Sequence, residues 1–181
     1  GNRTVVSALI KHLLGTTDPE QEEQVLIAID KLQKIGAKKV CDILDETCQL
    51  PHSKSQVLLD TIQDPTQVNQ MLQQIEGDNT AQDAYVRLID TLNHLNKIST
   101  TLGTIKLDLS IVRGLGYYTG LVFETTLNNK QDVGSVCSGG RYNQLIDRFS
   151  SQSLEGIGGS IGLDRLLVAL EDKTQKTQRS Q

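Results

Sequence analysis

The sequence lacks the features that mark secreted, membrane-spanning and disulfide-bonded proteins. Its three cysteines are odd in number and form no CxxC pair, so we expect reduced thiols in a cytosolic protein rather than a disulfide framework or a zinc site. No run approaches the roughly 18 uninterrupted apolar residues that a membrane-spanning helix needs. The N-terminal segment also lacks the charged and then apolar pattern of a secretion signal, so we do not expect export.

Histidine is scarce as well. None of the three histidines shares a local ligand spacing with another histidine or with a cysteine: His12, His52 and His94. We therefore predict no metal site, and we expect structural or surface roles for these side chains.

Positive charge is not in excess, since the net charge is −4 and the sequence pI is about 5.4. A protein that holds nucleic acid by bulk electrostatics is usually basic, so any nucleic-acid partner must bind a local patch. Four lysines near one expected helix junction form such a patch, which we call the lysine quartet: Lys31, Lys34, Lys38 and Lys39. Two interpretations stay open, a solvated helix face and a docking site for a phosphate backbone.

Apolar residues recur with a helical period over about residues 4–100. Asp18 and Asp64 each offer an N-cap carboxylate, followed by proline at the first helical position and glutamine at the third. The clearest helix spans 81–98, where the apolar residues form one stripe. Three glycines are expected helix stops: Gly15, Gly36 and Gly77. This half is predicted to be an all-helical module of five or six short helices.

The second half, from about residue 104, changes to a strand-like period of two. We expect strands over 105–111, 118–127 and 133–139, and helices over 141–149 and 160–171. The last nine residues are polar and are expected to form a linker or a frayed tail. Helices in one half and strands in the other predict an α+β fold.

Glycine adjoins arginine three times in this half, at Arg113, Arg141 and Arg165, with the pair Tyr117 and Tyr118 between the first two. Glycine lets the backbone approach a ligand closely, and arginine offers a planar charged fork that suits phosphate. No Rossmann unit or Walker lysine accompanies these glycines. The alternative is that each arginine caps a helix or pairs with a surface carboxylate.

These segments resemble motifs of histidyl-tRNA synthetases. IVRGLGYYTGLVFE resembles the first histidine-specific signature, SVCSGGRYNQLI resembles the second, and GIGGSIGLDRLLVAL is similar to motif 3 of class II aminoacyl-tRNA synthetases. The resemblance covers about residues 105–171. It implies a helical insertion module joined to part of the class II antiparallel sheet, which is flanked by helices. The implied division is 1–102 for the insertion module, 103–172 for the C-terminal part of the catalytic domain, and 173–181 for the linker or tail; an alternative assigns the first residues to the catalytic core.

The resemblance also implies roles for individual residues. Arg113 would be catalytic and would contact the ATP α-phosphate and the substrate carboxylate. The histidine pocket would contain Tyr117, Tyr118, Tyr142, Gly139 and Gly140. ATP would further contact Arg165 near its γ-phosphate and lie against the backbone at Gly162. The family uses Mg²⁺ with ATP, although we identify no ligand for the ion in this chain.

The function implied is that of a histidine–tRNA ligase, a cytoplasmic homodimer that forms histidyl-adenylate from ATP and L-histidine and then charges tRNA(His). The lysine quartet would contact that tRNA. A different reading is a non-catalytic synthetase-like paralogue, either a regulatory subunit of histidine biosynthesis or a tRNA-sensing domain. Such paralogues often lose the catalytic arginines or the tyrosine pair, which this sequence retains.

Two departures from the family pattern stand out. Position 116 is glycine where most members have aspartate. Motif 1, motif 2 and the C-terminal anticodon-binding domain are not in the sequence, so we expect a fragment that cannot catalyse adenylation alone.

Overall fold

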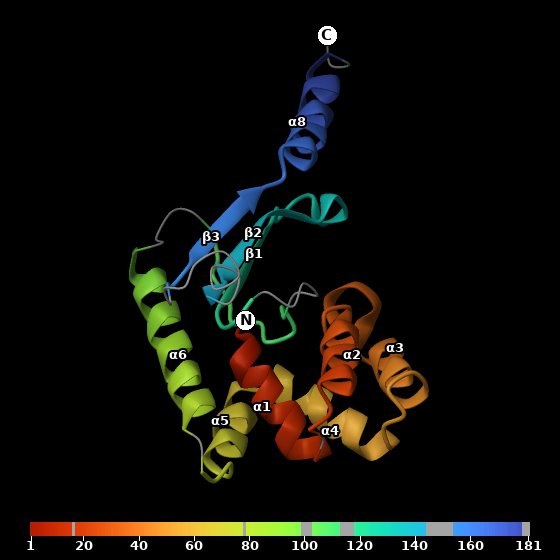
Figure 1. Cartoon of the computed structure of the whole chain (residues 1–181). Helices are drawn as coiled ribbons and strands as arrows, with labels where there is room; N and C mark the ends of the chain where they lie inside the picture. The colour runs from red at the N-terminus through yellow and green to blue at the C-terminus, as the bar shows by residue number, and fades with distance from the viewer. Residues whose placement is uncertain (16, 78, 99–102, 113–117, 144–153, 179–181) are drawn as a thin grey trace.

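The computed structural model describes residues 1–15, 17–77, 79–98, 103–112, 118–143 and 154–178, with the backbone alone for 172–178. A helical module forms one part of the molecule, and a small antiparallel sheet followed by a long helix forms the other (Figure 1). The predicted α+β class is therefore confirmed. Most of the predicted helix 141–149 lies outside the described residues. In the described part, no helix combines the length and the apolar character needed to cross a membrane.

Six described helices make up the module: α1 (Arg3–Leu14), α2 (Pro19–Ile29), α3 (Leu32–Glu46), α4 (His52–Gln63), α5 (Pro65–Gln73) and α6 (Thr80–Ile98). The Asp18 and Asp64 carboxylates cap α2 and α5 by accepting backbone N–H groups, as the sequence predicted. α1 ends at Gly15, whose φ is 69°, and Gly36 interrupts α3 with a φ of 81°. Both glycines adopt the left-handed region that side chains disfavour.

The core of the module is built around α1, which contacts α2, α4, α5 and α6. Its inward stripe consists of Val5, Val6, Leu9 and Ile10, all fully buried. Burying a side chain of this kind contributes roughly 1.5–3 kcal/mol. Tyr85 of α6 adds a polar tie, because its hydroxyl donates to the carbonyl of Pro65 at 2.9 Å. Burial raises the pKa of this phenol, and the nearby Asp64 carboxylate raises it further.

The sheet has the order β1-β2-β3, and both strand pairs are antiparallel. The elements of this part are β1 (Val122–Thr126), η1 (Gln131–Val133), β2 (Ser135–Arg141), β3 (Ile157–Ile161) and α8 (Leu163–Gln178). β1 and β2 confirm two predicted strands: β1 is shorter than predicted, and β2 has the predicted length but lies two residues further along the chain. β3 was not predicted, and the helix expected from residue 160 begins at Leu163 and continues through Gln178.

The strand predicted over 105–111 is wrong. Asp108 Oδ1 accepts hydrogen bonds from the Ser110 backbone N–H at 2.9 Å and from the Ser110 hydroxyl at 2.6 Å, and the chain turns there. The outer side of β1 is met instead by Asn2, which bridges Leu121. A strand needs a backbone partner, and this stretch has none among the described residues.

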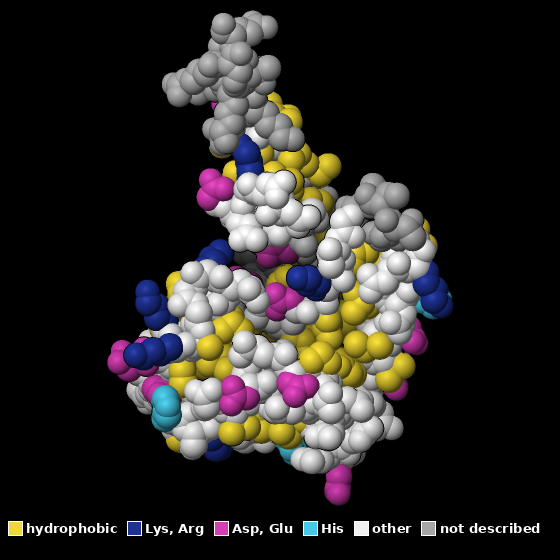
Figure 2. Space-filling view, turned by 180° about the vertical axis from the view of Figure 1, so that it is seen from behind, with side chains coloured by type: hydrophobic (Ala, Val, Ile, Leu, Met, Phe, Trp, Pro, Cys, Tyr) yellow, Lys and Arg dark blue, Asp and Glu magenta, His cyan; other side chains and the backbone are white. Residues whose placement is uncertain are grey.

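β3 is an edge strand in the described sheet, and its Ile157 and Ile161 are each 68% exposed. α8 contacts β2 and η1 and then runs beyond the sheet (Figure 1), so it covers less of the sheet than we expected. Hydrophobic side chains lie along the projecting helix (Figure 2), among them Leu163 and Val168. An unpaired edge beside exposed apolar residues is prone to association with other chains.

Candidate functional site

Two tyrosines lie over bare backbone on one side of the sheet. Gly140 of β2 and Gly158 of β3 are cross-strand partners. A Cβ atom on Gly140 would stand 2.5 Å from the Leu121 carbonyl oxygen and 2.9 Å from Cδ1 of Tyr118. A Cβ atom on Gly158 would stand 2.6 Å from the Tyr142 hydroxyl oxygen. The two rings therefore share one face of the sheet, which we call the tyrosine face.

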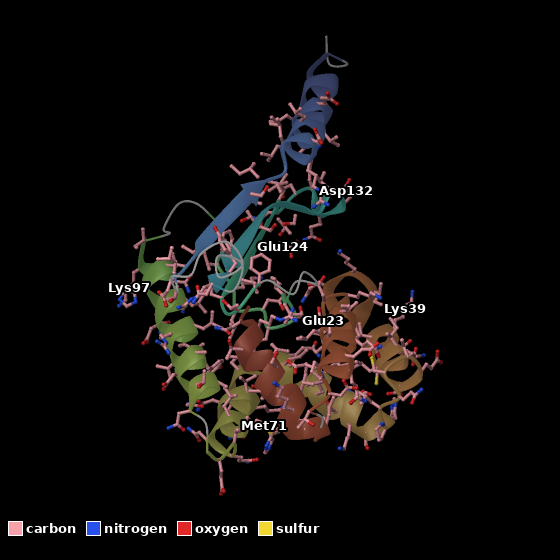
Figure 3. The ribbon with its side chains drawn as sticks, in the orientation of Figure 1. Glu23, Lys39, Met71, Lys97, Glu124 and Asp132 are labelled. Carbon is pink, nitrogen blue, oxygen red and sulfur yellow. The ribbon has the colours of Figure 1, made fainter. Side chains whose placement is uncertain are left out.

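The next row on the tyrosine face is polar. Glu124, Ser138 and Ser160 are cross-strand partners two residues along each strand, and side chains alternate in direction along a strand. Glu124 is half-buried and lies where the sheet meets the helical module (Figure 3). It borders a small pocket of about 50 Å³, whose other lining residues are Asp30, Gln33, Lys34, Ser110 and Ile111. Figure 2 shows the hollow between the two parts, with acidic and basic side chains at its rim.

Gly139 belongs to the opposite face. A Cβ atom there would stand 2.1 Å from the Gly158 carbonyl oxygen and 2.6 Å from Cζ of Phe123. The Phe123 ring also lies close to Gly159, the partner of Gly139 across the strands. Gly139 thus permits strand and ring packing, and the structure does not bring it to the tyrosine face with Gly140.

Arg141 is directed away from the tyrosine face by the same alternation. Its guanidinium pairs with Glu155, and its Nε donates to Asn143 Oδ1 at 3.2 Å. Asn143 Oδ1 also accepts the Gly156 backbone N–H at 3.1 Å. These contacts join the end of β2 to the start of β3, which fits the surface-pair alternative for this arginine.

Arg165 lies at the far end of β2 from the tyrosines. It follows Gly162, whose backbone N–H donates to the Val136 carbonyl at 2.8 Å, and its Nη1 donates to the Ser135 carbonyl at 2.6 Å. Gly140 lies five positions along β2 from Ser135, which corresponds to about 17 Å along a strand. A Cβ atom on Gly162 would meet nothing closer than 3.6 Å, so packing does not require glycine there.

The remaining predicted site residues are those outside the described part of the chain and the lysine quartet. Arg113 and Tyr117 lie outside the described residues, as does Gly116. The four side chains of the lysine quartet are all exposed around the Gly36 interruption, and Lys39 points outward from α3 (Figure 3). The structure therefore gathers Tyr118, Tyr142 and Gly140; of the lysine quartet, Lys34 lines the small pocket that Glu124 borders.

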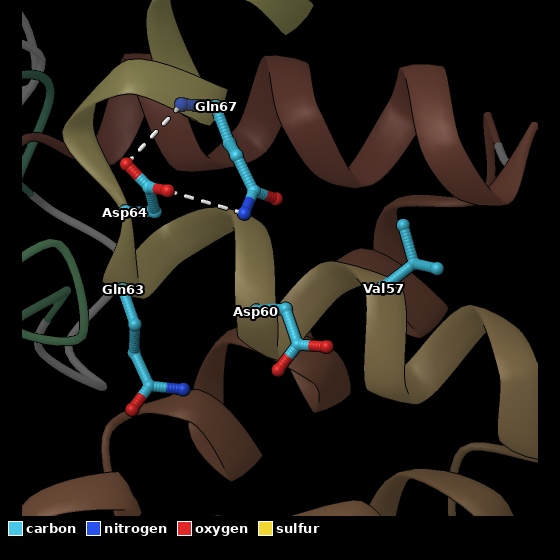
Figure 4. A pocket seen from close by; sticks show the side chains of 5 residues that line it. All are labelled: Val57, Asp60, Gln63, Asp64 and Gln67. Atoms are coloured by element: carbon cyan, nitrogen blue, oxygen red, sulfur yellow. Dashed lines mark hydrogen bonds between the residues drawn. The ribbon is translucent and has the colours of Figure 1, made fainter.

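A surface pocket of about 360 Å³ lies on the helical module rather than on the sheet. It is lined by residues of α4, α5 and the turn between them: Val57, Asp60, Gln63, Asp64 and Gln67 (Figure 4). Asp64 is already engaged there, because its Oδ2 accepts from the side-chain amide of Gln67 at 3.2 Å and its Oδ1 caps α5. This pocket offers no nucleophile and no acid–base pair.

One cluster of side chains was not predicted from the sequence. Cys41, Asp45 and His52 place their ligand atoms within 4.8 Å of one another at the corner between α3 and α4. The spacing of Cys41 and Asp45, four residues apart on a helix, could have indicated a shared face. The contribution of His52 depends on the loop that returns it to α3, and no local pattern reveals that.

Comparison with known proteins places these features in context. The profile of the family described as histidyl-tRNA synthetase matches residues 1–166. The chain is 40% identical over 167 residues to a histidine–tRNA ligase of Helicobacter pylori, which covers 88% of this chain and 38% of that protein. It is 37% identical over 177 residues to the ligase of Helicobacter hepaticus, covering 94% and 40%. The chain thus spans about two-fifths of the length of these relatives.

Solved structures agree on the fold. The crystal structure of histidyl-tRNA synthetase from Nostoc sp. PCC 7120 aligns with a TM-score of 0.80 at 30% identity, covering 96% of this chain and 41% of that one. An ATP phosphoribosyltransferase regulatory subunit/histidyl-tRNA synthetase from Bacillus halodurans aligns with a TM-score of 0.70 at 21% identity, covering 94% and 43%. The second likeness carries fold information alone.

Proposed function

The chain belongs to the histidyl-tRNA synthetase family, and we propose that it supplies the histidine-binding and ATP-binding wall of a histidine–tRNA ligase. The observation that carries this proposal is the tyrosine face, where Tyr118 and Tyr142 lie over glycine backbone while Arg165 stands at the far end of β2. Phenols thus lie at one end of β2, and a guanidinium lies near the other end.

The phenol end suits an imidazole. Imidazole has one donor and one acceptor nitrogen when neutral, and a phenol hydroxyl serves as either partner. Gly140 and Gly158 allow the two rings to lie against the strands, because any side chain there would collide with them. Tyr117 is retained in the proposed pocket on the family resemblance, whereas Gly139 faces the other side of the sheet and supports the strand packing behind the pocket.

The guanidinium end suits a triphosphate. Arginine binds phosphate oxygens through paired N–H groups, and Arg165 is exposed at the first turn of α8. A distance of about 17 Å along β2 leaves room for an amino acid and a nucleotide placed end to end. Gly162 at the start of α8 is the proposed backbone contact for the nucleotide.

The proposed reaction joins the two ends. The histidine carboxylate oxygen attacks the α-phosphorus of ATP, pyrophosphate leaves, and the resulting adenylate later passes histidine to tRNA. Adenylyl transfer depends on positioning and on stabilising negative charge, which is the role proposed for Arg113. Mg²⁺ prefers oxygen ligands, so the Glu124, Ser138 and Ser160 row fits an ion that accompanies ATP. When bound there, the ion would supply positive charge that offsets the charge of the phosphates.

The remaining elements of the proposal concern the tRNA and the cellular setting. The exposed lysine quartet lies on the helical module and is proposed to contact phosphates of tRNA(His). On the family resemblance, the ligase is proposed to be a homodimer in the cytoplasm. A regulatory paralogue is the competing function, and it predicts no adenylation.

The test is ATP–pyrophosphate exchange in a chimera in which this chain replaces the matching 38% of the Helicobacter pylori ligase. We expect exchange that depends on L-histidine, and no exchange from the 181-residue chain alone, since it spans only part of such an enzyme. A folded chimera without histidine-dependent exchange would contradict the ligase proposal and favour the regulatory function. Turnover by the isolated chain would contradict the proposed inactivity.

A further inference from the structure

We propose that Cys41, Asp45 and His52 bind a divalent metal ion of the zinc class, which fastens α3 to α4. Cys41 and Asp45 lie one turn apart on α3, and His52 is the first residue of α4. Cys41 Sγ lies 3.6 Å from His52 Nδ1, which lies 2.6 Å from Asp45 Oδ2. Sulfur, nitrogen and oxygen thus converge from two helices. This inference does not depend on the proposed ligase function.

The same contacts argue against a nucleophilic triad. In a triad the histidine uses one ring nitrogen for the nucleophile and the other for the carboxylate. Here both Cys41 and Asp45 approach Nδ1 of His52. Burial raises the pKa of the Cys41 thiol, and the carboxylates of Asp45, Asp42 and Asp60 raise it further, so no activated thiolate results. The same negative surroundings favour a cation.

The sulfur–nitrogen distance suits tetrahedral zinc. Zinc–sulfur and zinc–nitrogen bonds of about 2.3 and 2.05 Å at a tetrahedral angle separate the two ligand atoms by about 3.6 Å. That is the separation between Cys41 Sγ and His52 Nδ1. A nitrogen and an oxygen bound to the same ion stand about 3.4 Å apart. The ion therefore replaces the hydrogen bond between His52 and Asp45 and moves the two atoms apart by about 0.8 Å.

The two oxygens of the Asp45 carboxylate have different surroundings. Its Oδ1 is buried without a hydrogen-bond partner in the described part of the chain, and so is the hydroxyl oxygen of Ser55. The Ser55 hydroxyl lies close enough to be the main cause of a lowered pKa at Asp45, which burial opposes and His52 reinforces. Buried polar atoms without partners are rare in folded proteins. Oδ1 and the Ser55 hydroxyl are therefore natural partners for each other, which leaves Oδ2 as the oxygen that faces His52 and the proposed ion.

Charge balance is favourable. Binding releases the thiol proton of Cys41 to solvent, and the resulting thiolate together with the Asp45 carboxylate neutralises a dication. His52 contributes a neutral lone pair from Nδ1. The group has three members among the described residues, and the His52 side chain is 73% exposed, so water can fill the fourth position.

The loop between α3 and α4 holds His52 in place without a metal. The Thr47 backbone N–H donates to the Ile43 carbonyl at 2.8 Å, and that of Leu50 donates to the Leu44 carbonyl at 3.1 Å. Cys48 and Leu50 are buried and anchor the loop in the core. The site is therefore preorganised, which lowers the ordering cost of binding.

The test is Co²⁺ titration of the full 181-residue chain, followed by its visible and near-ultraviolet spectrum. We expect tetrahedral d–d bands and a sulfur-to-cobalt charge-transfer band. Cys41→Ser should remove the charge-transfer band, and His52→Gln should weaken affinity by more than about 100-fold, because losing even an outer partner of a ligand costs about 10–100-fold. His94→Gln, at an exposed histidine on α6, is the matched control and should leave both unchanged.

A second measurement avoids substitutions in the core. Zn²⁺ should raise the melting temperature of the unmodified chain, a chelator should reverse the rise, and His52→Gln should abolish it. Absence of any charge-transfer band in the unmodified chain would overturn the proposal, and the cluster would then be a hydrogen-bonded contact only. A band that survives in Cys41→Ser would also overturn it, since another thiol would be the ligand.

Discussion

Replacing Gly140 by alanine tests whether the tyrosine face depends on bare backbone. The added methyl would stand 2.5 Å from the Leu121 carbonyl oxygen and 2.9 Å from the Tyr118 ring. Non-bonded atoms do not approach closer than about 3.0 Å, so β1 and β2 must separate by about 0.5 Å and the ring must move. Overpacking of this kind costs about 1–3 kcal/mol. For a chain of this size each kcal/mol lowers Tm by about 2–4 °C, which gives a fall of about 2–12 °C.

The assay is thermal unfolding followed by the near-ultraviolet circular dichroism of tyrosine. Three of the four tyrosines belong to the sheet part of the chain, and Tyr85 alone belongs to the helical module, so this signal reports mainly on the sheet. Far-ultraviolet ellipticity, which reports mainly on α1 to α6, should change much less.

Gly120→Ala is the control for this experiment. Gly120 is also buried, but a methyl there would meet only the flexible Arg141 side chain at 3.6 Å. We expect Gly120→Ala to change stability by less than about 0.5 kcal/mol. An unchanged midpoint for Gly140→Ala, or equal losses for the two variants, would refute the argument that Gly140 is required by close approach.

Three further predictions concern the helical module. Replacing all four members of the lysine quartet by alanine in the chimera should weaken tRNA binding and reduce the slope of log binding constant against log salt concentration by about three. Lys97→Ala is the control and should change neither. Equal tRNA affinity of the quartet variant and the parent chimera at low salt would contradict the proposed contact. A hydrogen bond from the Thr66 backbone N–H holds the pKa of Asp64 below its usual value. The ionised Asp64 carboxylate therefore contributes stability above about pH 4, and this contribution is lost as the pH falls through the lowered pKa of the folded state. Asp64→Asn should therefore flatten the acid decline of Tm, and an identical decline in both proteins would contradict this. Leu9→Ala should lower the free energy of unfolding by about 2–5 kcal/mol, whereas Ile27→Ala, at a residue 42% exposed, should lower it by about 0.5 kcal/mol. Similar urea midpoints for the two variants would contradict the placement of α1 at the centre of the core.

Features written in local sequence were predictable. The Asp18 and Asp64 caps, the glycine stop at Gly15 and the stripe of helix 81–98 depend on residues within one or two turns. Such signals act over short distances along the chain, so the periodicity and the capping residues suffice.

Features set by distant partners were not predictable. The alternating stretch 105–111 has the pattern of a strand but lacks a neighbour to pair with in the described sheet. β3 shows the opposite case. Gly158 and Gly159 have low strand propensity and give no strand pattern in the sequence, but this segment pairs with β2 and so forms a strand. Register also separates Gly139 from Gly140, because neighbouring residues of a strand face opposite sides.

The most direct test of the proposed division between the two ends of β2 compares two substitutions in the active chimera by pyrophosphate exchange. Tyr118→Phe should raise the KM for histidine by about tenfold, as expected for one lost hydrogen bond, and leave the KM for ATP unchanged. Arg165→Ala should raise the KM for ATP and leave the KM for histidine unchanged. If both variants raise the same KM, or if neither changes its own, the phenol end and the guanidinium end do not bind the two substrates separately and the account is contradicted.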